Sequence, residues 1–334
     1  MPEPEPVAGA IYDIGYQHYA GKRLGRRGAV RALYVQGLRS LFGIGRGGRA
    51  KIPPIALIAI MTIPALIQAA LIGITQGNIA LITHDGYFGT TVWMFGLFCA
   101  FQTPELVTGD QQSRVLALYF SRALLRSDYV LARVGALVTA LFMVAMLPHI
   151  IMLLGEYFAA AHVLDAMKAS LPLIPRIIGA ALAVSVLLAT VSLTIAAIIR
   201  RRPFATAAIL AFMLIAGAFV TPLVLSRPDK MRGLLLASPT LVGRGVSAWI
   251  FDTVKVHPPA DTSWLLPPMP RPPATADSAT KAAWRTERDR RWQSRPRGPV
   301  EAARFPGGVY LGAMVGYILL GAGVLALRYR NIDT

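Results

Sequence analysis

Side chains able to ligate metals or act as nucleophiles are few and scattered along the chain. The single cysteine, Cys99, leaves no thiol pair for zinc and no intrachain disulfide. No H-E-x-x-H spacing and no G-x-S-x-G motif occurs, so the zinc-peptidase and serine-hydrolase patterns are missing. The histidines stand apart in the sequence, at His18, His84, His149, His162 and His257. We therefore predict no catalytic residue and no metal site.

One stretch, GYQHYAGKR at 15–23, has the glycines and the lysine of a nucleotide-binding loop. A P-loop needs four residues between these glycines and a Ser or Thr directly after its lysine. Here five residues intervene, and Arg23 follows Lys22. The sequence therefore predicts a chain that is not itself an enzyme and that binds no cofactor of its own.

The composition indicates a membrane protein. Of 334 residues, 54% are hydrophobic and 15% are charged, with a net charge of +17. In a soluble protein this charge would suggest nucleic acid as a partner, but beside so many apolar residues it indicates basic loops at anionic lipid headgroups. We predict membrane lipid and no nucleic acid as a partner. The excess of Arg over Lys, together with much Ala, is typical of a high-GC bacterium and hence of a bacterial plasma membrane.

The predicted fold class is an all-α polytopic membrane protein with six transmembrane helices, since about 20 apolar residues span a bilayer as a helix. The six segments are 52–74, 88–101 (extending to about 106), 130–157, 171–199, 204–225 and 309–327. Short flanks rich in Lys and Arg place both termini in the cytoplasm.

The chain divides accordingly into four parts. These are a cytoplasmic segment with an interfacial helix (1–51), spans one to five with a cytoplasmic segment at 104–128 (52–226), a long external loop (227–308), and the sixth span with a cytoplasmic tail (309–334). Within the loop, 234–256 predicts short helices on the outer leaflet or on the bundle, with Ser238 as cap and Pro239 at the first position. The remainder, 257–304, is dense in proline and mixed charge, which predicts disorder.

Ionisable groups are missing from the middle of the predicted spans, apart from one histidine. An ion-driven carrier normally needs such groups within the bilayer. His149, beside Pro148, has two readings: a ring bonded to a neighbour at a helix kink, which is favoured, or a proton relay. The sequence therefore disfavours ion-driven transport.

Between spans two and three lies an amphipathic segment, 114–128. Its apolar residues recur with helical spacing, at Leu116, Tyr119, Phe120, Ala123 and Leu124. Its basic residues are Arg114, Arg122 and Arg126, and Ser127 or Asp128 can cap the span that follows. A short helix held by two spans at the cytoplasmic face could act as a lever, because force on it tilts both neighbours. The alternative is a helix that rests on lipid headgroups through its arginines.

The stretch PELVTGDQQSRVLALYFSRALLRSDYVLAR, 104–133, resembles the permease subunit of ABC-2 type transporters. Asp110–Ser113 is similar to the family's polar turn, Leu116 and Leu118 to its helix, and Arg126 and Arg133 to the basic positions beyond it. The proline expected near Ala123 is missing. The beginning IYDIGYQHYAGKRLGRRGAVRALYVQGLRSLFG and the ending LALRYRNIDT also resemble actinobacterial members of this family.

This resemblance implies the membrane subunit of an ATP-driven exporter, paired with a second identical or related permease and with two copies of an ATPase subunit that binds ATP and Mg. The amphipathic segment would be the coupling helix. Its coupling residues would be Arg114, Leu116, Tyr119, Phe120, Arg122 and Arg126, with exposed Tyr119 and Phe120 as anchors in the ATPase. The competing class is a non-transporting membrane anchor, sensor or assembly protein.

Three further sets of residues belong to this hypothesis. The stretch 30–44 predicts an interfacial helix whose apolar face lies in lipid. Gly308, Gly312 and Gly316 form a small-residue face that would pack either within the chain or against a second permease. Polar candidates for lining a substrate path are Gln68, Gln102, Ser185, Thr190, Ser192, Thr194 and Thr221.

Overall fold

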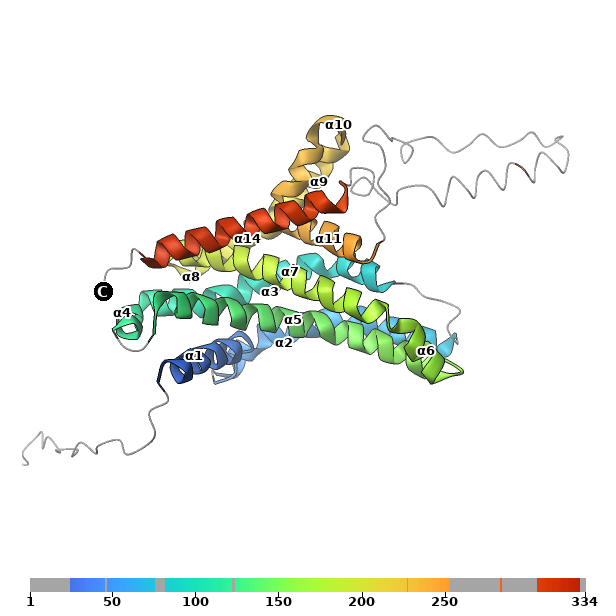
Figure 1. Ribbon diagram of the computed structural model, residues 1–334, viewed down its shortest axis with the longest axis horizontal. Helices are drawn as coiled ribbons and strands as arrows, with labels where there is room; N and C mark the ends of the chain where they lie inside the picture. The colour runs from blue at the N-terminus through green and yellow to red at the C-terminus, as the bar shows by residue number, and fades with distance from the viewer. Residues whose placement is uncertain are drawn as a thin grey trace, which may run out of the picture.

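The regular structure in the described part of the chain is entirely helical (Figure 1). The computed structural model describes residues 25–45, 47–75, 82–113, 115–121, 124–226, 228–252, 283 and 305–330. The longer helices are α1 (Gly25–Leu41), α2 (Ile52–Ile74), α3 (His84–Gln112), α5 (Arg126–Ala159), α7 (Leu173–Ile198) and α14 (Gly307–Arg330). The shorter ones are α4 (Val115–Phe120), α6 (Val163–Ser170), α8 (Arg202–Leu210), α9 (Ala216–Ser226), α10 (Pro228–Met231) and α11 (Pro239–Ile250).

Five helices within the described ranges are long and apolar enough to cross a membrane. They run over Gly48–Ile74, Arg126–Ala159, Leu173–Ile198, Arg202–Val224 and Gly307–Arg330. These correspond to the first, third, fourth, fifth and sixth predicted spans, as expected for an all-α polytopic membrane protein. The predicted second span, 88–101, lies within α3, which is 29 residues long but is not one of the five.

Helix α3 is less apolar because it is enclosed by protein. It packs against α7, α8 and α11, and buried residues occur along its whole length. Its polar groups find partners on these neighbours: the Thr103 hydroxyl donates to Ser192 Oγ at 3.2 Å, and Gln111 Nε2 donates to the Ala197 carbonyl at 3.0 Å. A helix covered in this way needs no continuous apolar surface, so a hydropathy criterion that assumes lipid contact does not detect it.

The fifth apolar helix is not continuous. A π-helical stretch, η2 (Ala211–Ile215), separates α8 from α9. Wider π-helical turns of this kind occur mostly as single interruptions of α-helices and are frequent at functional sites. The predicted span at 204–225 corresponds to the apolar helix Arg202–Val224, which contains this π-helical stretch.

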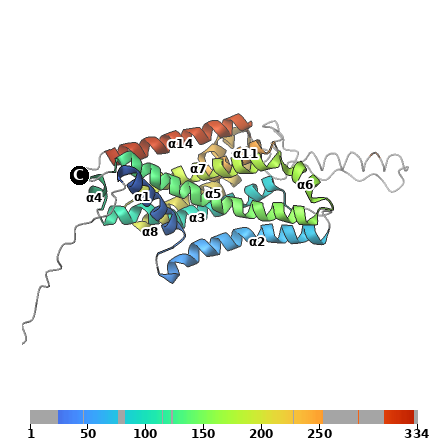
Figure 2. The same cartoon turned by 60° about the horizontal axis from the view of Figure 1, so that its bottom comes forward.

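The bundle has two distinct ends (Figures 1 and 2). At one, called the α4 end below, lie α1, α4 and the C-terminal end of α14. At the other, the α6 end, lie α6 and the C-terminal end of α5. The long helices run between these ends, so the helices on either side of α4 are antiparallel.

Helix α1 lies at the α4 end, but its apolar face does not lie in lipid as predicted. Leu33 and Leu41 are buried, and α1 packs against α5 and α3. The Tyr34 hydroxyl donates to Thr139 Oγ1 at 2.9 Å, which fixes α1 on α5. An apolar helical stripe suits protein as well as lipid, and here α5 covers it.

The predicted short helices at 234–256 are a 3₁₀ turn, η3 (Arg232–Ala237), followed by α11. Helix α11 begins after Ser238 with Pro239 at its first position, and it packs on α7, α14 and α3. The Ser238 side chain does not bond to the helix backbone but pairs with Thr240 Oγ1 at 3.0 Å. Apart from Ala283, the stretch 257–304 lies outside the described residues.

The tightest approach of α2 to α5 gives a first prediction. A Cβ added at Gly155 would lie 2.6 Å from Ala69 Cβ and 2.7 Å from Ala69 Cα. We expect Gly155→Ala to lower the free energy of unfolding by about 1–3 kcal/mol, because backbone must move to admit the methyl group. The matched control is Gly73→Ala in α2, where a Cβ meets nothing within 4 Å. It should change stability by less than about 0.5 kcal/mol, since Gly73 is the next-to-last residue of α2 and the added methyl group meets no neighbour. Unfolding in detergent micelles measures both, and equal effects would contradict the packing described.

Candidate functional site

The segment between α3 and α5 forms a shorter helix than its sequence pattern predicts. Helix α4 ends at Phe120, and α5 begins at Arg126. Leu125 is extended and is the N-cap of α5, and its N–H donates to Asp128 Oδ2 at 3.0 Å. Asp128 therefore stabilises the start of α5, as predicted, but from the third helical position. Arg114, Arg122 and Ala123 of the predicted stripe lie outside the described residues.

Asp128 also joins α1 to α5. Arg26 donates to its two carboxylate oxygens at 2.7 Å and 2.8 Å. Hydrogen bonding to Asp128 raises the pKa of Arg26 above its ordinary value, so this guanidinium stays charged.

The two predicted aromatic anchors of α4 lie half-buried rather than exposed. The rings of Tyr119 and Phe120 pack on Tyr129 of α5, with centroids 6.4 Å and 6.1 Å from its ring. Leu116 is buried, whereas Leu118 is 59% exposed. Leu118 therefore lies on the outward face of α4. The opposite, aromatic face, formed by Tyr119 and Phe120, packs α4 against the bundle.

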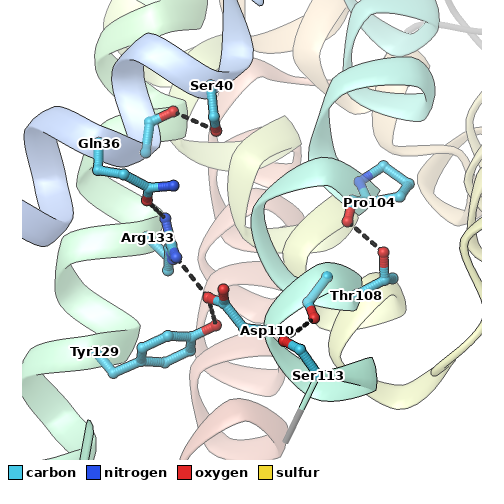
Figure 3. A network of polar contacts seen from close by, with 10 residues as sticks. Gln36, Ser40, Pro104, Thr108, Asp110, Ser113, Tyr129 and Arg133 are labelled. Carbon is cyan, nitrogen blue, oxygen red and sulfur yellow. Dashed lines mark hydrogen bonds and ion pairs between the residues drawn. The ribbon is translucent and has the colours of Figure 1, made fainter. Parts of the chain in front are cut away.

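Beneath α4 is a buried polar network that links three helices (Figure 3). Tyr129 of α5 donates through its hydroxyl to Asp110 Oδ2 of α3 at 2.9 Å. Arg133 forms an ion pair with the same carboxylate oxygen and donates to Gln36 Oε1 of α1 at 2.7 Å. The Arg133 side chain is only 2% exposed, so its charge depends on Asp110 for neutralisation. Gly37 makes room for it, because a Cβ there would lie 3.1 Å from Arg133 Nη1.

At the α4 end, further contacts join α5 to α14 and α3 to α8. The Tyr329 ring of α14 lies 5.2 Å from that of Tyr129, and Arg126 Nη1 donates to the Arg330 carbonyl at 3.0 Å. Glu105 of α3 pairs with Arg202 at the start of α8. Helix α4 is therefore connected through Tyr129 and its neighbours to α1, α3, α5 and α14.

Five of the seven predicted path-lining residues form hydrogen bonds within their own helices. The five hydroxyl residues each donate to the backbone carbonyl four residues earlier in their own helix, namely Ser185, Thr190, Ser192, Thr194 and Thr221. Gln68 is buried, and its Oε1 accepts from the Ile82 N–H at 3.2 Å. Gln102 is buried in α3. These contacts are those of helix packing.

The glycines of α14 divide into two groups. A Cβ added at Gly308, Gly312 or Gly316 would meet no described atom within 4 Å. At Gly321, by contrast, a Cβ would lie 2.6 Å from Thr190 Cγ2 of α7. Among the described residues, the predicted small-residue face therefore does not pack within the chain.

Two participants in the network were not predicted, namely Gln36 and Tyr129. A signal for the latter exists in the sequence: two helices joined by a short connection run antiparallel, so residues equally far from the connection lie side by side. Asp110 and Tyr129 flank α4 at such distances.

No protein-family model matches this chain, and no curated protein shows significant sequence similarity to it.

Proposed function

We propose that this chain is the transmembrane subunit of an ATP-driven ABC-2 type exporter, and that α4 is its coupling helix. In this proposal α3 is the second of six spans, and the α4 end faces the cytoplasm. Helix α1 and the C-terminal end of α14 both lie at the α4 end (Figure 1). Between α1 and the end of α14 the chain then crosses the membrane an even number of times, which the five apolar helices and α3 together satisfy.

The observation that carries the proposal is the attachment of α4. It is a short helix between two long antiparallel helices, α3 and α5, and its aromatic face rests on Tyr129. Through Asp110 and Arg133 that support is continuous with α3, α5 and α1. A push on the outward face of α4, at Leu118, would thus act on three helices at once. This is the mechanical requirement for driving a membrane bundle from a separate ATPase.

The complex would contain two such ATPase subunits and a second, identical or related permease. ATP and Mg would be bound by the ATPase, and this chain would transmit the movement. The open glycine face of α14, at Gly308, Gly312 and Gly316, is our proposed contact with the second permease, because small residues allow close helix approach in lipid.

Capture of the ATPase tests the proposal. The chain is co-expressed with a candidate ABC ATPase subunit from the same genome, and the two are co-purified in detergent. We expect Leu118→Glu to reduce the captured ATPase at least about tenfold, since a charge replaces the central apolar contact of an interface. Leu164→Glu is the matched control, because Leu164 is 72% exposed on α6 at the opposite end.

Equal capture by wild type and Leu118→Glu would show that α4 does not dock the ATPase. Failure of wild type itself to capture the ATPase would favour the non-transporting anchor or assembly protein instead. Loss of capture in Leu164→Glu but not in Leu118→Glu would reverse the proposed orientation.

A further inference from the structure

Two histidines that are distant in the sequence meet inside the bundle near the α6 end. His84 is the first residue of α3, and His149 is on α5, about 15 Å before that helix ends at a rise of 1.5 Å per residue. Their Nδ1 atoms are 2.9 Å apart, and their rings stack with centroids 5.2 Å apart. His149 is fully buried, and Phe88 stacks on its ring at 4.3 Å.

A carboxylate lies at the outer edge of this pair. Glu156 follows His149 by two turns of α5, and its Oε1 is 3.4 Å from His84 Nε2. The Glu156 side chain is 36% exposed, whereas that of His84 is 6% exposed. The three groups thus lie in series, from a partly exposed carboxylate to a buried imidazole.

The hydrogen bond between the rings fixes how hydrogens are distributed. Only one of two facing Nδ1 atoms carries the shared hydrogen, and in the neutral arrangement that can accept a proton beside Glu156, His84 Nδ1–H donates to His149 Nδ1 and His84 Nε2 is bare. The Nε2 atoms of both rings are buried, and among the described residues neither has a hydrogen-bond partner. Buried polar atoms without a partner are rare, so the protonation of this pair needs an explanation.

We propose that Glu156, His84 and His149 form a site that binds one proton, taken from the aqueous phase on the α6 side. The proton binds to His84 Nε2, beside Glu156, and makes His84 an imidazolium, while His149 stays neutral with its hydrogen on Nε2. The pair then holds three ring hydrogens in place of two. The positive charge rests on His84, directly beside the Glu156 carboxylate.

Other ionisable groups near the pair do not substitute for Glu156. Helix α2 contributes none over its length, and α3 contributes Asp85 and Tyr87, of which Tyr87 donates to the Met61 carbonyl. From α7, Arg176 donates to the Phe251 carbonyl at 3.3 Å, and from α11 Arg244 lies beside Gly89. Glu156 is the group recorded in an ion pair with His84.

A metal ion is a poorer occupant of this site than a proton. Glu156 approaches Nε2 of His84, whereas the two rings face each other through Nδ1, so the three groups do not converge on one point. Within the described part of the chain, no group of three His, Cys, Asp or Glu side chains is arranged to hold a metal ion.

The test is a pH titration of the full chain in lipid nanodiscs, with ¹⁵N-labelled histidine followed by NMR. The chain has five histidines, so single His→Gln variants identify each signal. We expect the signals of His84 and His149 to change together with one common midpoint. Glu156→Gln should lower the common midpoint by about one pH unit, because it removes the neighbouring negative charge.

Asp165→Asn is the matched control, since it removes an exposed carboxylate from α6 at the same end and should leave the midpoint unchanged. A second variant, His84→Gln, should abolish the titration of His149. The proposal is overturned if neither ring titrates between about pH 4 and 9, as for a neutral packing pair. It is equally overturned if Glu156→Gln leaves the midpoint in place. Neither result depends on the ATPase, so the outcome is independent of the proposed function.

Discussion

Asp110→Asn is expected to lower the free energy of unfolding by about 3–5 kcal/mol, the usual cost of removing one partner from a buried ion pair. The variant keeps the size of the side chain but leaves the Arg133 guanidinium, 2% exposed, without its carboxylate. Gln36 would still accept one hydrogen bond, and the Tyr129 ring, 5.4 Å from the guanidinium carbon, would still face the charge. Neither supplies a negative charge. Unfolding by SDS in mixed micelles, followed by circular dichroism, gives the difference.

Two further variants make this result specific. Asp110→Asn combined with Arg133→Met should recover most of the loss, because an apolar side chain in the same space needs no counter-charge. Asp128→Asn, the same exchange in the exposed pair with Arg26, should cost far less. If Asp110→Asn and Asp128→Asn had equal effects, the charge of Arg133 would not depend on Asp110.

Tyr129→Ala is expected to cost a similar amount, about 3–5 kcal/mol, because it empties the space beneath α4. The ring is fully buried and lies between the aromatic face of α4 and Tyr329 of α14. With the ring gone, α4 loses its support, so capture of the ATPase subunit should fall as far as in Leu118→Glu, although Leu118 itself is intact.

Tyr129→Phe separates the ring from its hydroxyl. This variant keeps the ring contacts and loses only the hydrogen bond to Asp110, so it should cost about 1 kcal/mol and retain ATPase capture. The same SDS-unfolding and ATPase co-purification measurements apply to both variants. Full capture by Tyr129→Ala in folded protein would disprove the role of this ring as the support of α4.

Length and apolarity were sufficient to predict the five helices that are long and apolar enough to cross a membrane. The five apolar spans, the boundary of α2 at Ile52–Ile74 and the start of α11 at Pro239 all follow from runs of apolar residues and from proline at a first turn. Apolar runs and proline positions do not reveal whether a helix packs against lipid or against another helix of the protein. The stripe on α1 was therefore predicted to face lipid, whereas α5 covers it.

The same reason explains why Tyr119 and Phe120 were predicted to be exposed. Aromatic residues on one face of a short helix suit a partner subunit or the chain's own bundle, and here both rings pack on Tyr129. His149 was recognised, but its partner was not, because 65 residues separate it from His84. The pairing of Asp110 with Tyr129 becomes predictable once α3 and α5 are taken as an antiparallel pair about α4, because these residues lie two and three positions from the facing helix ends. His84 and His149 lie 28 and 23 positions from the same ends, so equal distance from the turn does not predict their contact.

The enclosure of α3 has a consequence for biogenesis under the proposed topology. Ribosomes deliver α3 before α5, α7, α8 and α11, which cover most of it in the folded protein. Its threonine and glutamine groups reach the translocon while their later acceptors are still unsynthesised, so α3 on its own is a poor candidate for lateral release into lipid. In nascent chains arrested just after α3, this helix should therefore be incompletely inserted in the membrane. In chains extended through α7, it should be stably inserted. Insertion of the second crossing would thus be completed by sequence translated well after it.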